Sequence, residues 1–325
     1  MIPPAKKYTY ILKEVIFRPR KKCYMKNGKS RLLLLIVLPL LGLVAAFIGF
    51  RNKTFREQVQ INYPLLKTGE QLRSAEQVKR WYLTASGEND TLSVSKQTPF
   101  SARIIARNKG NEKAFRFSIN GDTLNAQLSY VTLSYEQTLF QHWFSKEPLV
   151  QDARKSLQNL KAYMEDSKRF YGYDIQLVKV EDTAFLFKSV TVPLEMKREA
   201  TRKLFDELIA YANTTDAGYN GIRIFYSLKG EKDIKLFVSI GVTKAIEPDA
   251  ASGIEYKKMP LGKNLLVANY QGSLSEVYKA YQAIDRFKSD HNFTSMAIPF
   301  QKILSDGYDF DENQLVQLKV CYPVF

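Results

Sequence analysis

Apolar and polar residues alternate at every second position in two stretches of the N-terminal half of the chain. This period is typical of strands that bury one face. Asn120-Gly121-Asp122 lies between the two stretches and is a turn signal, so the pattern predicts an antiparallel hairpin. The alternating apolar residues are Phe115, Phe117, Ile119, Val131, Leu133 and Tyr135.

Two helices are predicted on either side of these strands. Residues 69–83 read as a helix with Leu72, Val78 and Trp81 among its apolar members. Residues 147–170 carry apolar residues three or four positions apart, which form one continuous stripe on a helix. The members of that stripe are Leu149, Ala153, Leu157, Leu160 and Met164.

The C-terminal half repeats one pattern twice, with an offset of about eighty residues. Each copy reads strand, strand, helix, strand, strand. The strands are predicted at 173–180, 184–192, 221–228, 232–242, 254–259, 265–270, 297–304 and 314–324, and the helices at 195–213 and 273–290. The predicted fold class is α+β, with a domain at 55–171 and a second domain of two βαββ repeats at 172–325.

Residues 32–50 form an uncharged apolar run of a length that can span a bilayer as a helix. A single transmembrane helix is therefore expected there. The alternative is a cleaved signal peptide, because Val44-Ala45-Ala46 offers small residues at a suitable place. The basic leader is long for a signal peptide, which favours the uncleaved anchor.

The net charge of +15 is concentrated before this apolar run. Residues 1–31 hold ten basic residues and one acidic residue, a net charge of +9. The positive-inside rule then predicts an inner (cytoplasmic) membrane protein with a cytoplasmic tail at 1–31 and the bulk of the chain extracytoplasmic or periplasmic. The tail is either a topology signal alone or also a contact for anionic lipid. A nucleic-acid partner is not expected, because most of the excess charge has this other explanation.

Cysteine and histidine offer little chemistry. The chain contains Cys23, Cys321, His142 and His291, with no cluster of metal-ligand spacing. We expect no metal, no cofactor and, since the two cysteines fall on opposite sides of the predicted membrane helix, no internal disulfide.

The order of elements in the first domain resembles that of the START-like (SRPBCC) domain. The segment SAEQVKRWYL at 74–83 is similar to an early segment of that family. The resemblance implies a curved sheet around a long helix, in a shortened and degenerate form. Trp81 and Trp143 would either belong to the core or line a ligand cavity.

The second domain resembles the GyrI-like effector-binding domain, which is the drug-sensing half of several AraC-type and MerR-type regulators. Three segments carry the resemblance: NYQGSLSEVYKAYQAIDRF, AIPFQKILSD and LVQLKVCYPVF. It implies two βαββ units facing each other around a concave, aromatic-lined site for a small molecule.

The resemblance also implies which residues line that site, and it includes departures from the family. Gln301 falls where the family has a buried carboxylate, and Ile303 where it has a tyrosine. An amide cannot balance a buried cation, so cation sensing is expected to be absent or altered. The remaining ligand-binding candidates are Tyr270, Tyr281, Phe225 and Tyr226, unless these aromatic residues simply fill the cleft.

The sequence therefore predicts a membrane-anchored, non-catalytic protein that binds or senses a small hydrophobic molecule. The alternative is a hydrolase of small reactive compounds that uses the same cleft. Gln301 argues against the hydrolase, because an amide cannot act as a general base. A transcription regulator is disfavoured, since no DNA-binding domain is recognisable. The ligand, the oligomeric state and any protein partner stay open.

Overall fold

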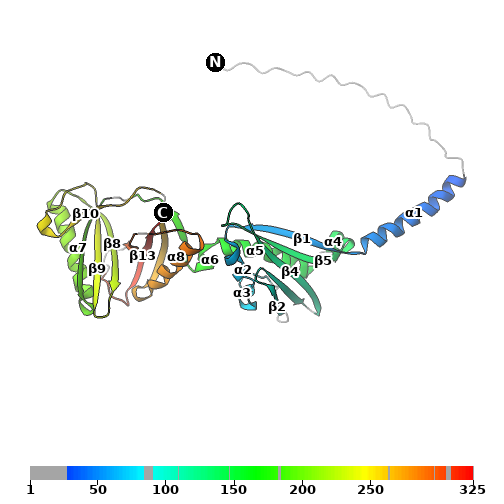
Figure 1. Ribbon diagram of the computed structural model, residues 1–325, viewed down its shortest axis with the longest axis horizontal. Coiled ribbons are helices and arrows are strands. Elements are labelled where there is room, and N and C mark those ends of the chain that lie inside the picture. Colours follow the sequence, from blue (N-terminus) through cyan, green and yellow to red (C-terminus); the bar gives the residue numbers. More distant parts are fainter. Residues whose placement is uncertain are drawn as a thin grey trace, which may run out of the picture.

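The computed structural model contains two antiparallel sheets, which lie one after the other along the molecule with a helix projecting from the N-terminal one (Figure 1). The α+β character predicted from the periodicities is therefore present. The structure describes residues 28–83, 91–108, 110–145, 147–181, 184–262, 264–295, 297–304 and 309–324.

The first sheet has five strands in the order β1-β5-β4-β3-β2. The last strand in the sequence thus lies beside the first, and the others follow as a meander. The strands are β1 Asn52–Ile61, β2 Thr91–Thr98, β3 Ser101–Asn108, β4 Asn111–Gly121 and β5 Ser129–Thr138. The helices beside them are α2 Leu65–Glu70, α3 Ala75–Lys79, α4 Leu139–Phe144, α5 Pro148–Glu165 and α6 Ser167–Tyr171.

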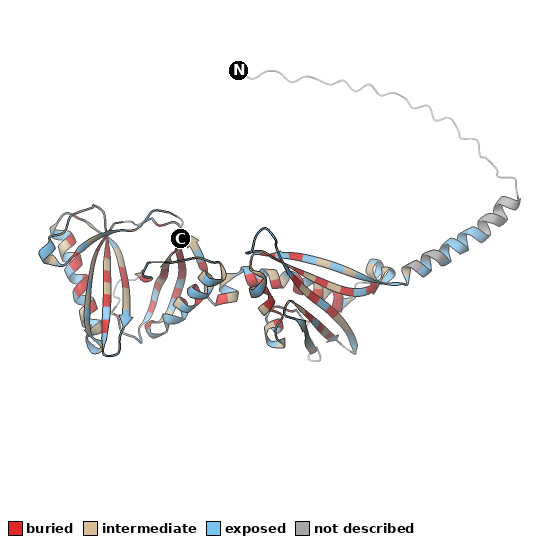
Figure 2. Cartoon of the chain, viewed as in Figure 1, coloured by how far each residue is buried: buried red, intermediate tan, exposed pale blue. Residues whose placement is uncertain are grey.

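Helix α5 packs its apolar stripe against the first sheet. Ala153, Leu157 and Leu160 on the helix are fully buried, as are Phe115 and Phe117 on β4. The buried positions alternate along the strands with half-buried and exposed ones (Figure 2). Burying aromatic and branched side chains at this period is the main contribution to stability, because each removes a large apolar area from water.

Two sequence expectations for this region are corrected. The helix predicted at 69–83 is two short helices, because Ser74 adopts an extended conformation and its side chain accepts a hydrogen bond from the Gln77 N–H at 3.3 Å, which begins α3. Trp81 is fully buried in the core, whereas Trp143 is 70% exposed on α4 and belongs to neither a core nor a cavity. The likeness to START-like domains stays a prediction.

The second sheet has eight strands in the order β10-β7-β9-β8-β12-β13-β11-β6. The strands of the first repeat are β6 Ile175–Val178, β7 Ala184–Pro193, β8 Tyr219–Lys229 and β9 Asp233–Val242. Those of the second are β10 Glu255–Lys258, β11 Leu265–Ser273, β12 Phe300–Ile303 and β13 Leu315–Pro323. The repeats exchange their first strands: β6 pairs with β11, and β10 pairs with β7.

Helices α7 (Lys197–Thr214) and α8 (Tyr278–Asp290) pack on one face of this sheet. Short 3₁₀ turns at Leu194–Met196 and Leu274–Glu276 begin both of them, and a third lies at Ala250–Ser252. The predicted βαββ repeat is present in both halves, with element ends that differ by a few residues. The limits drawn for the domains, 55–171 and 172–325, stay a prediction.

The two sheets meet where α2 and α6 approach the end of α8. Lys67 on α2 forms an ion pair of 3.3 Å with Asp290, and the Tyr171 hydroxyl donates to the same carboxylate at 2.7 Å. The Tyr63 ring lies 4.9 Å from that of His291. These contacts join the two parts by buried aromatic surface and by a shared carboxylate.

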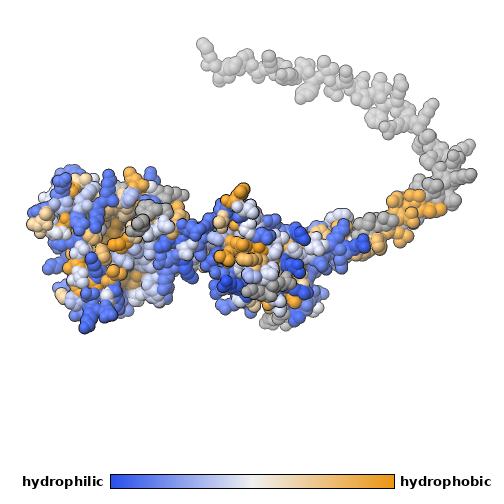
Figure 3. Space-filling view, viewed as in Figure 1, coloured by the Kyte–Doolittle hydropathy of each residue, from blue (hydrophilic) through white to orange (hydrophobic). Residues whose placement is uncertain are grey.

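The predicted transmembrane helix is contradicted. The apolar run forms helix α1 (Gly28–Gly49), whose exposed hydrophobic residues are visible in Figure 3. Among the residues that the structure describes, however, no helix is long and apolar enough to cross a membrane.

The predicted single-pass localisation in the inner membrane is contradicted by the same finding, because it depended on that helix. The basic tail at 1–31 and Cys23 fall largely outside the described residues, which begin at residue 28.

Candidate functional site

The face of the second sheet that points away from α7 and α8 carries a row of side chains across its centre. Phe187 on β7 lies opposite Ser239 on β9, which in turn lies opposite Ile224 on β8. Ile224 lies opposite Lys302 on β12, and Lys302 opposite Lys319 on β13. We call this surface the open face, and the strand register brings residues from both repeats together on it.

The open face is hollowed into two adjoining cavities. The larger has a volume of about 410 Å³, and the smaller about 220 Å³. They share Phe185, Ile224 and Phe300, so they form one groove along the sheet. A total of this size lies within the range of small-molecule sites in proteins.

Aromatic side chains form most of the floor of the larger cavity. The ring of Phe237 lies 6.3 Å from that of Phe187 and 5.8 Å from that of Tyr226. Phe185 and Phe300 also line the cavity. Rings at these distances are tilted against one another and present a continuous apolar surface, which suits the apolar part of a ligand.

Lysines surround this aromatic floor. The Lys257 ammonium lies 3.5 Å from the centroid of the Phe187 ring, and Lys258 also lines the larger cavity. Lys302 and Lys319 lie directly opposite each other on neighbouring strands and line the smaller one. Glu181 is the one acidic residue among the described lining residues of the two cavities. The groove is therefore apolar with a positive rim.

The Cys321 thiol lies in the floor of the smaller cavity but is not arranged as a nucleophile. Burial raises the pKa of Cys321 to about 12, although the nearby Lys302 and Lys319 act in the opposite direction. A thiol with this pKa stays protonated at neutral pH, and the thiolate is the nucleophilic form. In the described part of the chain no group of three or more His, Cys, Asp or Glu residues could hold a metal ion.

Most of the residues predicted from the family resemblance lie on the other face of the sheet, toward the helices. Phe225 and Gln301 lie opposite each other on β8 and β12. Both are buried, as are Ile303 and Tyr270, and the apolar members of this set belong to the same hydrophobic core as the residues of α7 and α8. The structure thus brings these residues together, but inside the core; their role in ligand binding stays a prediction.

Phe310 packs next to Phe225 on the face of the second sheet that points toward α7 and α8, which we call the helix face. Its side chain is 4% exposed and packs between Phe205 on α7, at 5.6 Å, and Phe225, at 5.3 Å. Its backbone has a φ of 58°, which an L-residue adopts at an energetic cost. An aromatic ring supplied by the chain itself therefore occupies the side of Phe225 that faces α7.

Tyr226 and Tyr281 lie nearer to the groove than the other predicted residues. Tyr226 lines the larger cavity, and its ring lies 6.4 Å from that of Tyr281 on α8. Tyr281 is half-buried and packs against the core. Tyr226 is thus the predicted residue that the structure places in the groove.

Apart from Tyr226, the aromatic residues of the open face were not predicted from the sequence. Phe185, Leu186 and Phe187 follow one another in β7, and such a run indicates a strand with apolar contacts on both faces. Phe237 likewise lies on the face that the alternation in β9 assigns to polar residues. These interruptions of the period-two pattern were the available signal for the groove.

Comparisons with known proteins agree with the architecture of the second part. Residues 173–324 match the family model described as GyrI-like small molecule binding domain, so this part of the chain is a GyrI-like small-molecule binding domain. No curated protein matches the chain significantly.

Three similar solved structures show how distant the likeness is. The EcmrR C-terminal domain has 13% identity and a TM-score of 0.36, covering 47% of this chain and 98% of its own. EcmrR in a complex with DNA has 14% identity and a TM-score of 0.39, covering 54% and 67%. A hydrolase from Listeria innocua has 10% identity and a TM-score of 0.32, covering 46% and 91%. Likenesses at this level add nothing to the assignment.

Proposed function

We propose that the GyrI-like domain binds a small amphipathic molecule, with an apolar body and an acidic group, in the groove of the open face, and that it does so without catalysis. The observation that carries the proposal is the combination of an aromatic floor with a rim of lysines. Phe187, Phe237 and Tyr226 supply the apolar contact, and Lys257 lies at its edge.

The apolar floor supplies most of the expected affinity. A ligand that covers it removes the exposed parts of several rings from water, at roughly 25 cal/mol for each Å² of apolar surface. Part of this gain is lost to the ordering of the ligand and of the side chains around it. A ligand of modest size and micromolar affinity is therefore the natural occupant of a cavity of about 410 Å³.

The charges decide which end group the ligand carries. A carboxylate or sulfonate gains from the neighbouring ammonium groups of Lys257 and Lys258, whereas a cation is repelled by them. Gln301 is buried on the opposite face of the sheet, and its neutral amide cannot compensate the charge of a cation bound there. Lipophilic anions are thus favoured over the lipophilic cations that a buried carboxylate would attract.

Catalysis is not part of the proposal. Cys321 lies in the groove as a protonated thiol, and Gln301 cannot take up a proton as a general base. No observation on the described residues favours the alternative of a hydrolase.

The experiment compares two dyes on the full-length protein. The anionic probe is 8-anilinonaphthalene-1-sulfonate and the cationic probe is rhodamine 6G, each followed by fluorescence titration. Ser239→Trp places a large ring in the middle of the groove. Ser189→Trp is the matched control, because Ser189 is exposed on the same face but does not line either cavity.

We expect saturable binding of the anionic probe and at least tenfold weaker binding of the cationic one. Ser239→Trp should weaken binding of the anion by about tenfold or more, which corresponds to about 1.4 kcal/mol, and Ser189→Trp should change it less than twofold. Stronger binding of the cation, or equal loss in the two variants, would refute the proposal. Circular dichroism of both variants excludes unfolding as the cause of any loss.

A further inference from the structure

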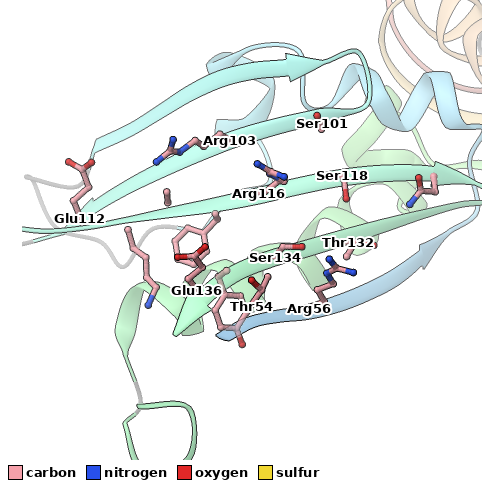
Figure 4. A pocket seen from close by; sticks show the side chains of 15 residues that line it. Thr54, Arg56, Ser101, Arg103, Glu112, Arg116, Ser118, Thr132, Ser134 and Glu136 are labelled. Atoms are coloured by element: carbon pink, nitrogen blue, oxygen red, sulfur yellow. The ribbon is translucent and has the colours of Figure 1, made fainter. Parts of the chain in front are cut away.

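A second surface with chemistry of its own lies on the first sheet, on the face that points away from α5. Arg56 on β1 lies opposite Ser134 on β5, Ser134 lies opposite Arg116 on β4, and Arg116 lies opposite Arg103 on β3. Figure 4 shows the three guanidinium groups on one side of the sheet, with the serine between two of them. We call these four residues the arginine row.

The arginine row lies in a hollow of about 950 Å³. The neighbouring row across the sheet consists of hydroxyl side chains, because Thr132 lies opposite Ser118 and Ser118 opposite Ser101 (Figure 4). All three line the same hollow. Guanidinium and hydroxyl donors from four adjacent strands thus converge on one concave surface.

The three arginines have no carboxylate partner among the described residues, although acids lie close by in the sequence. Glu57 follows Arg56 directly, yet it pairs with Arg154 on α5 at 2.6 Å, on the opposite face. Glu112 also lines the hollow, but it pairs with Arg107 at 2.6 Å. Arg107 and Arg154 are therefore compensated by carboxylates, while the arginines of the row are not.

This arrangement costs the protein stability as long as the surface is empty. Arg103 and Arg116 are direct cross-strand neighbours, and like charges in that position repel each other. Glu136 also lines the hollow, but its direct neighbour on β1 is Thr54 and not an arginine, so it relieves this repulsion only in part. An anion bound between the two guanidinium groups would turn the repulsion into attraction.

We propose that the arginine row is a binding site for a soluble compound that carries two or more phosphate groups. Neighbouring strands lie about 5 Å apart, so one phosphate fits between Arg103 and Arg116. Arg56 lies two strands from Arg116, about 10 Å away, with the Ser134 hydroxyl between them for a second phosphate. A guanidinium binds phosphate through two parallel hydrogen bonds, and each phosphate has oxygens left for the serine and threonine hydroxyls.

The site is independent of the groove in the GyrI-like domain. It lies on a different sheet, and the cations of the row are arginines next to serine and threonine hydroxyls, whereas the groove combines lysines with an aromatic floor. The two ligands therefore differ in kind: an amphipathic molecule with one acidic group in the groove, and a polar polyanion on the arginine row.

The test measures binding of inositol hexakisphosphate and of inorganic phosphate to the full-length protein by isothermal titration calorimetry. The variants are Arg116→Gln and the double variant Arg103→Gln/Arg116→Gln. Arg107→Gln is the matched control, because Arg107 is an exposed arginine of the same strand as Arg103 that already has a carboxylate partner. Thermal unfolding of each variant without ligand is recorded as well.

We expect the polyphosphate to bind at least tenfold more tightly than inorganic phosphate. Arg116→Gln should lose roughly tenfold in affinity and the double variant more, with Arg107→Gln within twofold of wild type. Without ligand, Arg116→Gln should melt at the same temperature as wild type or higher, because a repulsion has been removed. This last readout separates loss of the site from loss of the fold.

Three results would overturn the proposal. The first is that neither probe binds the wild-type protein. The second is that Arg107→Gln loses as much affinity as Arg116→Gln, which would show attraction by the general charge alone. The third is that a single-stranded oligonucleotide binds far more tightly than the polyphosphate and depends on Arg116, which would assign the surface to nucleic acid.

Discussion

Phe310 provides a sharp test of how the helix face of the second sheet is packed. Its ring is 4% exposed between Phe205 and Phe225. Phe310→Ala removes this ring and leaves a cavity in a core that relaxes only in part, so it should lower the free energy of unfolding by about 3–5 kcal/mol. The surface substitution Leu315→Ala, at a side chain that is 82% exposed, serves as control and should cost less than about 0.5 kcal/mol.

The backbone of Phe310 makes a second comparison possible. Glycine adopts a positive φ without steric cost, whereas alanine at a φ of 58° is strained. Phe310→Gly should therefore be more stable than Phe310→Ala by about 1 kcal/mol, the reverse of the usual order. The cavity would also lie beside Phe225, so Phe310→Ala should take up indole that the wild-type protein excludes.

Urea denaturation followed by far-UV circular dichroism measures both differences in the full-length protein. A cost below about 1 kcal/mol for Phe310→Ala would contradict the packing of the ring, because no buried aromatic side chain is lost so cheaply. A Phe310→Gly variant that is less stable than Phe310→Ala would contradict the positive φ.

Two further predictions concern buried polar groups. The hydroxyls of Thr68 and Ser129 hydrogen-bond to each other at 2.8 Å in the core. Ser129→Ala should lower the free energy of unfolding by about 1–3 kcal/mol, because it leaves Thr68 unsatisfied, and adding Thr68→Val should recover part of the loss. Additive losses in a double-mutant cycle, measured by urea denaturation, would contradict the pairing. Burial raises the pKa of Cys321 to about 12, so the native protein in a Cys23→Ser background should not react with Ellman's reagent at pH 8. The urea-unfolded chain should react and release one equivalent of thionitrobenzoate from the reagent. Rapid labelling of the native protein would contradict the buried thiol.

Local periodicity was sufficient to predict the elements of the second domain. The alternation in β9 and β13 and the helical stripe of α7 each bury one face, and burial of one face is what the pattern encodes. The split between α2 and α3 was missed, although Ser74 followed by Gln77 is a local signal for the start of a helix.

The pairing of strands and the position of the groove could not be derived in this way. The exchange of β6 and β10 between the repeats depends on which strand each of them pairs with, namely β11 and β7. The alternation of apolar and polar residues along the sequence holds no information on the pairing partner. The arginine row was missed for the same reason. Arg56, Arg103 and Arg116 are far apart in the sequence, and only the strand register brings them together.

The exchange of first strands has a consequence for the origin of the fold. A chain that contained one βαββ unit alone would have a first strand with no partner in its own half of the sheet. Two copies of such a chain could complete the sheet as a twofold-symmetric dimer, each lending its first strand to the other. Fusion of two copies through the connection at 243–254 would then yield the order β10-β7-β9-β8-β12-β13-β11-β6 seen in this protein. Duplication and fusion would also free the two halves to diverge, so that one half contributes Phe187 and Phe237 to the groove while the other contributes Lys302 and Lys319.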